Sequence, residues 1–214
     1  MTNIKLRRLK KLAKELIKIA PFLSHDIETL IMGAELKPHT AEGRIVEDGR
    51  FTKALKKIHE SLRGQNYALI GGLAVQHWVS VRPTNDIDIV LLASDLIDVK
   101  TLFPNGSETA LVYYVKIEGT LVDFMHSQIF PWTQDAIKSA VQKSDTGTSI
   151  PVVLPEYLIL YKMHAARQRD LEDVKDLLKN NKVYGKARKL VHQYFTPEDL
   201  EDFEQLAREA EFGV

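Results

Sequence analysis

The fold is decided by the stretch from Gly71 to Leu92, which reads GGLAVQHWVSVRPTNDIDIVLL. Its last part, from Asp86 onwards, is rich in Ile, Val and Leu and predicts a β-strand. Because successive side chains of a strand point to opposite faces, Asp86 and Asp88 should share one face while the isoleucines beside them enter the core. Two neighbouring carboxylates repel each other, and a divalent cation such as Mg²⁺ would remove that repulsion. The motif therefore predicts a cation site on a strand.

A pair of glycines stands immediately upstream of this strand. The apolar segment 67–70 predicts a short strand that runs directly into Gly71 and Gly72, and residues 73–81 predict a helix that stops before Pro83. Glycine allows a ligand to approach the backbone closely, and the first turn of a helix offers free N–H groups to a phosphate. A phosphate site at this turn is therefore expected, although many strand-to-helix turns use glycine without binding anything.

A third acidic residue, Asp123, interrupts the apolar segment 121–125, which predicts another strand. Together with residues 112–117 it should form a hairpin around Glu118-Gly119-Thr120. If this strand pairs beside the first, three carboxylates converge on one face and can hold two Mg²⁺ ions roughly 4 Å apart. The alternative is that Asp123 simply faces water from one side of an antiparallel sheet, and that the first two aspartates are solvated at a sheet edge.

The rest of the chain predicts mainly helices. Pro155 at a first helical position opens a helix to about Gln168, and Thr196 caps another before the acidic residues that follow it. Further helices are expected at 4–20, 22–32, 51–62, 133–141 and 170–178, with a strand at 150–154 and a loop at 33–50.

Composition excludes several classes of protein. The 29 basic and 29 acidic residues balance, which argues against a protein that binds polyanions over its whole surface. The charges are nevertheless uneven, because residues 1–20 form a basic amphipathic segment and residues 197–211 are acidic. The chain has no cysteine, no histidine spacing typical of zinc sites and no apolar run near the roughly 20 residues of a membrane span. We therefore expect a soluble, cytoplasmic protein without membrane contacts.

The order of these motifs resembles the nucleotidyltransferase superfamily of the DNA polymerase β type. That pattern has a glycine turn, a short helix, a D-x-D strand and a third acid on a neighbouring strand. The stretch from Gly71 through Arg82-x-Thr84-x-Asp86-Ile87-Asp88 is similar to the abortive-infection branch, which includes toxins of toxin–antitoxin pairs. A second similar stretch begins at Leu154-Pro155-Glu156 and continues through Lys162 to Arg169-Asp170-Leu171-Glu172-Asp173. The resemblance covers roughly residues 66–180.

The resemblance implies a role for individual residues. Asp86 and Asp88 would bind metal, and Asp123 would be a third ligand or the base for the incoming hydroxyl. Nucleotide-binding positions would be Gly71, Gly72, Arg82, Thr84 and Lys162, with Lys162 neutralising triphosphate charge. Asp170 would be a supporting acid, and Arg167 is expected to form a helix-end ion pair. Gly72 departs from the serine of many proven members, whose hydroxyl helps to hold a phosphate.

These observations lead to one expectation for fold and function. The fold should be α+β, with a small mixed sheet at 51–154, an N-terminal helical extension at 1–50 and C-terminal helices at 155–214. The function implied is Mg²⁺-dependent transfer of a nucleoside monophosphate from a nucleoside triphosphate, such as ATP, to an acceptor hydroxyl. The acceptor could be an RNA or tRNA end, a protein or a small aminoglycoside-like molecule, and an antitoxin could be a partner. The alternative is an inactive nucleotide-binding or interaction module.

Overall fold

The computed structural model describes residues 49–79, 84–109, 112–126, 130–142 and 150–212. The helices expected at 4–20 and 22–32, and Arg82, lie outside these ranges. The strands are β1 (Tyr67–Ile70), β2 (Asp86–Leu91), β3 (Ser107–Glu108), β4 (Val112–Ile117), β5 (Thr120–His126), β6 (Val141–Gln142) and β7 (Pro151–Val152). The helices are α3 (Gly49–Ser61), α4 (Gly71–Trp78), η2 (Ala93–Asp95), α5 (Leu96–Leu102), α6 (Thr133–Ser139), α7 (Pro155–Ala165), α8 (Gln168–Leu178), α9 (Asn181–Tyr194) and α10 (Pro197–Phe212).

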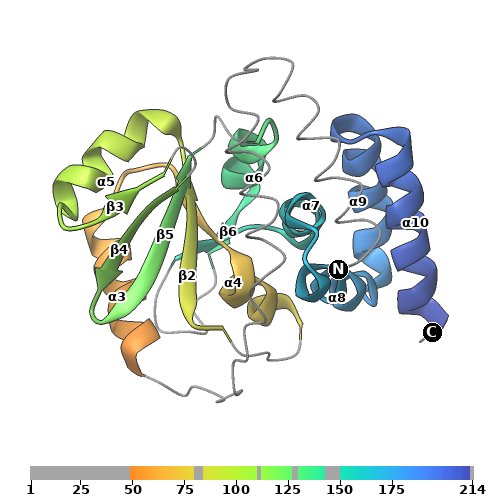
Figure 1. Cartoon of the computed structure of the whole chain (residues 1–214), viewed down its shortest axis with the longest axis horizontal. Coiled ribbons are helices and arrows are strands. Elements are labelled where there is room, and N and C mark those ends of the chain that lie inside the picture. Colours follow the sequence, from red (N-terminus) through yellow and green to blue (C-terminus); the bar gives the residue numbers. More distant parts are fainter. Residues whose placement is uncertain (1–48, 80–83, 110–111, 127–129, 143–149, 213–214) are drawn as a thin grey trace, which may run out of the picture.

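The strands form one mixed sheet in the order β3-β4-β5-β2-β1-β7-β6. Strand β2 pairs with β1 in antiparallel fashion and with β5 in parallel, so the two acid-bearing strands are direct neighbours. In Figure 1 the sheet and the four C-terminal helices α7 to α10 occupy opposite sides of the molecule, with α4 and α6 between them. The expected α+β class with a mixed sheet is confirmed. None of the helices in the described ranges is long and apolar enough to cross a membrane.

Strands β4 and β5 have one buried and one open face. Burial alternates along β4 and along β5 as far as Phe124, with Tyr113, Val115, Val122 and Phe124 on the buried face. Phe124 stacks on Phe103, just beyond α5, at a ring-centroid distance of 5.9 Å. The strands are joined by a two-residue turn in which Glu118 and Gly119 both have positive φ, as tight hairpins require. The predicted hairpin is therefore confirmed, and its alternation leaves Asp123 on the open face.

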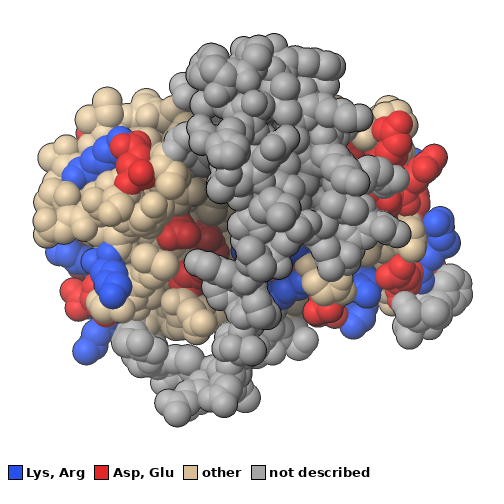
Figure 2. Space-filling model, viewed as in Figure 1, with Lys and Arg blue, Asp and Glu red and all other residues tan. Residues whose placement is uncertain are grey.

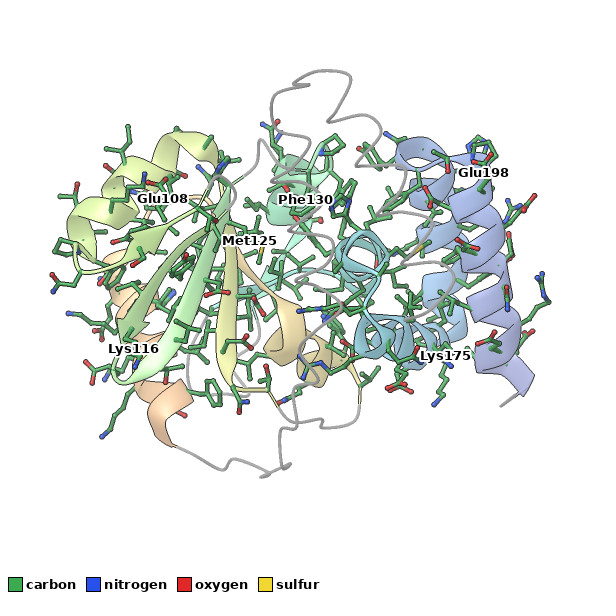
Figure 3. All side chains as sticks on the ribbon, in the orientation of Figure 1. Glu108, Lys116, Met125, Phe130, Lys175 and Glu198 are labelled. Atoms are coloured by element: carbon green, nitrogen blue, oxygen red, sulfur yellow. The ribbon has the colours of Figure 1, made fainter. Side chains whose placement is uncertain are left out.

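An aromatic cluster connects the sheet region to the C-terminal helices. Phe130 meets Tyr161 of α7 edge to face at 5.1 Å, and Trp132 stacks on Phe195 at 5.3 Å. Figure 3 shows Phe130 between the sheet and α7. The hydroxyls of Thr133 and Tyr161 lie 2.9 Å apart within this cluster. Such aromatic packing holds α7 in a fixed position beside the sheet.

Three details differ from the sequence prediction. The helix from Pro155 ends at Ala165 rather than near Gln168, because Ala166 adopts a left-handed conformation with φ of 49°. Helix α4 starts at Gly71 itself, two residues before the predicted start. The sequence pattern made no prediction for α5 or α9, since α5 has only seven residues and α9 contains a glycine that weakens its helical propensity.

Candidate active site

Three aspartates meet on the open face of the sheet. Asp88 of β2 lies directly opposite Asp123 of β5 in the parallel register, and Asp86 is two residues away on the same face. One carboxylate oxygen from each residue lies within 4.8 Å of the other two. The convergence predicted from the sequence is therefore confirmed. Figure 2 shows acidic side chains gathered on this side of the molecule, over the sheet.

The turn before α4 brings the backbone against this cluster. Gly71 has a φ of +68°, and a Cβ atom placed there would lie 1.7 Å from Oδ2 of Asp88. Only glycine leaves room for the carboxylate at this distance, and only glycine adopts this conformation without strain. Ile70, the N-cap residue of α4, has no polar side chain to satisfy the first-turn N–H groups. The acidic cluster and the start of α4 therefore form one continuous site.

The electrostatics of the cluster penalise its charged form. Burial raises the pKa of Asp88 to about 6, and the charges of Asp86 and Asp123 add to this rise. Burial, followed by the charge of Asp86, also raises the pKa of Asp123. Oδ1 of Asp123 is buried and has no hydrogen-bond partner. Three carboxylates that repel one another and leave a buried oxygen unpaired are suited to a hard divalent cation, which prefers oxygen ligands.

Thr84, two residues before the start of β2, supports Asp86. Its buried hydroxyl donates a hydrogen bond of 2.8 Å to Oδ1 of Asp86. This bond fixes the orientation of one carboxylate and leaves its second oxygen for a ligand. The nucleotide contact expected of Thr84 stays a prediction, and Arg82 lies outside the described residues.

A second group of charges lies where α7 meets α8. Lys162 is buried and forms ion pairs with Asp170 at 3.1 Å and with Asp173 at 2.7 Å. Arg167 donates to Asp170 through Nε at 2.6 Å and through a terminal nitrogen at 3.2 Å. Although burial opposes it, these hydrogen bonds and charges hold the pKa of Asp170 below its usual value. The helix-end ion pair expected of Arg167 is confirmed.

Both cations also act on the acidic cluster. The charges of Lys162 and Arg167 counteract the rise in the pKa of Asp88, so both lie within electrostatic reach of it. Lys162 is already engaged by two carboxylates, whereas the side chain of Arg167 remains 59% exposed. Sequence reasoning gave Arg167 only a structural role. Arg167 is the N-cap residue of α8 and directly follows Ala166, where the chain reverses. This reversal turns Arg167 back towards the sheet.

Two residues close in sequence to the site lie away from the acidic cluster. His126 belongs to the face of β5 opposite Asp123, because the two are separated by an odd number of positions. Trp78 packs against the core and donates a hydrogen bond of 2.9 Å from its indole N–H to the carbonyl oxygen of Val153.

No family model matches this sequence, and no curated protein matches it significantly. Several solved structures are similar in fold. TM1012 from Thermotoga maritima, named as a candidate nucleotidyltransferase, is 20% identical over 63% of this chain and 94% of its own, with a TM-score of 0.44. The antibiotic-resistance factor ANT(2'')-Ia is 17% identical over 76% and 91%, with a TM-score of 0.43. An antigenic nucleotidyltransferase-like protein from Paracoccidioides brasiliensis is 18% identical over 77% and 96%, with a TM-score of 0.42. The choice of a function rests on the site itself.

Proposed function

We propose that this chain transfers a nucleoside monophosphate from a nucleoside triphosphate to an acceptor hydroxyl. The observation that carries this proposal is the meeting of Asp86, Asp88 and Asp123 against the glycine turn of α4, with a buried oxygen of Asp123 left without a partner. Asp86, Asp88 and Asp123 would hold the metal. A divalent cation such as Mg²⁺, when bound there, would supply positive charge to the α-phosphate and to the pyrophosphate that leaves.

The protein groups around the cluster support the same reaction. The first-turn N–H groups of α4 offer hydrogen bonds to the triphosphate, and the exposed guanidinium of Arg167 offers a positive charge. Buried Lys162 would act by adding charge and by fixing Asp170, which in turn holds Arg167. Positioning and electrostatic stabilisation of this kind supply most of the catalysis in phosphoryl-transfer enzymes.

The proposed reaction replaces one oxygen bond of the α-phosphorus with another. The acceptor oxygen forms a bond to the α-phosphorus, the bond from that phosphorus to the bridging oxygen of pyrophosphate breaks, and pyrophosphate leaves with the electron pair. Asp123 would be either the third metal ligand or the base that takes the proton of the acceptor hydroxyl. An RNA end, a protein side chain or a small polyhydroxylated molecule can each supply the hydroxyl.

The test is transfer of label from an α-³²P nucleoside triphosphate, in the presence of Mg²⁺, to total RNA, protein or an aminoglycoside. We expect Asp86→Asn and Asp88→Asn each to lower the rate about a thousandfold or more, because each removes a charge that the reaction needs. Circular dichroism should show both variants folded. Asp176→Asn, at an acid that pairs with Lys179 on the surface of α8, is the control and should leave the rate unchanged. Activity that survives both active-site changes would rule out the proposed site.

A second function is favoured by one residue. Gly72 offers no hydroxyl to a phosphate, which suits a protein that binds a nucleotide without turning it over. Nucleotide binding that depends on Asp88, without release of pyrophosphate under any of these conditions, would select this alternative.

A further inference from the structure

Strand register places a continuous row of residues across the sheet at the level of the acidic cluster. Ile70 pairs with Asp88, Asp88 with Asp123, and Asp123 with Tyr114 of β4. The next row towards the hairpin turn contains Asp86, Leu121 and Lys116. Because adjacent strands are about 4.8 Å apart, Tyr114 and Leu121 are immediate neighbours of the carboxylates on the same face.

The two sides of the cluster differ in what they offer. On the β1 side stand the glycine turn against Asp88, the start of α4 and the positive charges of Lys162 and Arg167. These groups suit a triphosphate. On the β4 side, Asp123 pairs with Tyr114, and the next row of the same face holds Leu121 and Lys116. The nucleotide phosphates therefore belong on the β1 side, which leaves the β4 side for the other substrate.

The β4 side presents an exposed strip with a mixed character. Leu121 is 40% exposed and therefore presents an aliphatic surface beside the carboxylates. Tyr114 is half-buried, and Lys116 is exposed near the hairpin end of β4, as Figure 3 shows. We call Tyr114, Lys116 and Leu121 the acceptor strip.

We propose that the acceptor strip binds the end of a single-stranded nucleic acid and directs its terminal hydroxyl to Asp123. The aromatic ring of Tyr114 and the aliphatic surface of Leu121 suit a stacked base, and Lys116 suits the phosphate behind it. This inference rests on the proposed function, and it adds the class of acceptor and the side from which it arrives.

The experiment uses the full chain and a single-stranded RNA of about 12 nucleotides with a free 3′-hydroxyl. Tyr114→Ala should raise the KM for this RNA about tenfold with the KM for the nucleoside triphosphate unchanged, because it removes a stacking surface but no phosphate contact. Tyr114→Phe should restore the KM, since the ring is kept. Lys116→Ala should reduce the slope of log affinity against log salt by about 0.7, the value for one phosphate contact on a single strand.

The matched control is Lys189→Ala on α9, an exposed lysine on a different element. It should leave both the KM for RNA and the salt dependence unchanged. An equal effect of Lys189→Ala, or a change below twofold in Tyr114→Ala, would overturn the proposal. So would label that appears on protein or on an aminoglycoside and not on RNA.

RNA binding, measured without catalysis, tests the acceptor strip independently of the proposed function. Fluorescence anisotropy of the same RNA with Asp88→Asn needs no turnover, so it reports on the strip even if no transfer is found with any acceptor. Weaker RNA binding when Tyr114→Ala is added to Asp88→Asn would support the strip, and unchanged binding would refute it.

Discussion

Two groups of aspartates in this molecule experience opposite environments. Asp170 and Asp173 are buried beside Lys162 and Arg167, and the pKa of Asp170 is lowered. Asp88 and Asp123 face Asp86 instead of a close cation, and their pKa values are raised. The carboxylates of the first group pair with cations of the protein, whereas those of the second group form a cluster that fits the proposed divalent cation. The contrast separates carboxylates that hold the fold from carboxylates to which we assign a binding role.

The largest expected effect on stability comes from breaking the buried ion pairs of Asp170. Asp170→Ala should lower the free energy of unfolding by about 3–5 kcal/mol, because it leaves Lys162 and Arg167 without the carboxylate they share in a buried site. Urea denaturation measures this change. Asp176→Ala, six residues further along the same helix and paired with exposed Lys179, is the control and should cost less than about 0.5 kcal/mol. Similar losses in the two variants would remove the distinction drawn here.

Gly71→Ala tests the close approach of Gly71 to the carboxylate of Asp88. We expect a loss of about 2–4 kcal/mol, since the new Cβ would collide with Asp88 and the residue would be held at a positive φ. Gly64→Ala separates the two causes, because Gly64 also has a positive φ of 87° but has nothing within 4 Å of the added atom. Gly64→Ala should therefore cost only about 1–2 kcal/mol. Equal losses measured by thermal unfolding would mean that the contact with Asp88 contributes nothing.

The smallest effect concerns the pH dependence of stability. The folded pKa of Asp88 is about 6 against an ordinary value of 3.8, so the folded chain binds more protons between these values. The contribution of Asp88 to stability is therefore fully present below pH 3.8 and is lost as the pH rises through 6. Asp88→Asn should be more stable than the natural protein by up to about 3 kcal/mol near pH 8, and this difference should disappear near pH 4.

Denaturation curves at the two pH values with EDTA measure this difference. Adding Mg²⁺ near pH 8 should stabilise the natural protein and not Asp88→Asn, because a ligand that binds only the folded state shifts the equilibrium. A natural protein that is more stable near pH 8 than its Asp88→Asn variant, without any divalent cation, would contradict the raised pKa.

The sequence predicted the acidic cluster of Asp86, Asp88 and Asp123 better than the ion-paired aspartates Asp170 and Asp173. The same-face placement of Asp86 and Asp88 follows from strand alternation alone, and the adjacency of Asp123 required only that the hairpin pair beside β2. The ion pairs of Lys162 could not be derived in this way, because they depend on a chain reversal at Ala166, a non-glycine residue in a left-handed conformation. The positive φ of Gly71 and its approach to Asp88 likewise come from the packing of α4 on β2. Local periodicity carries no information about such tertiary contacts.

The parallel pairing of β2 with β5 also sets the order in which the acidic cluster assembles during folding. Asp88 and Asp123 come together only after the β4–β5 hairpin has docked on β2, and parallel pairing across a long connection is a slow, late step in folding. The charges of Lys162 and Arg167 are added later still along the chain. During synthesis, an incomplete chain would therefore carry the glycine turn and the first two aspartates before Asp123, Lys162 and Arg167 join them.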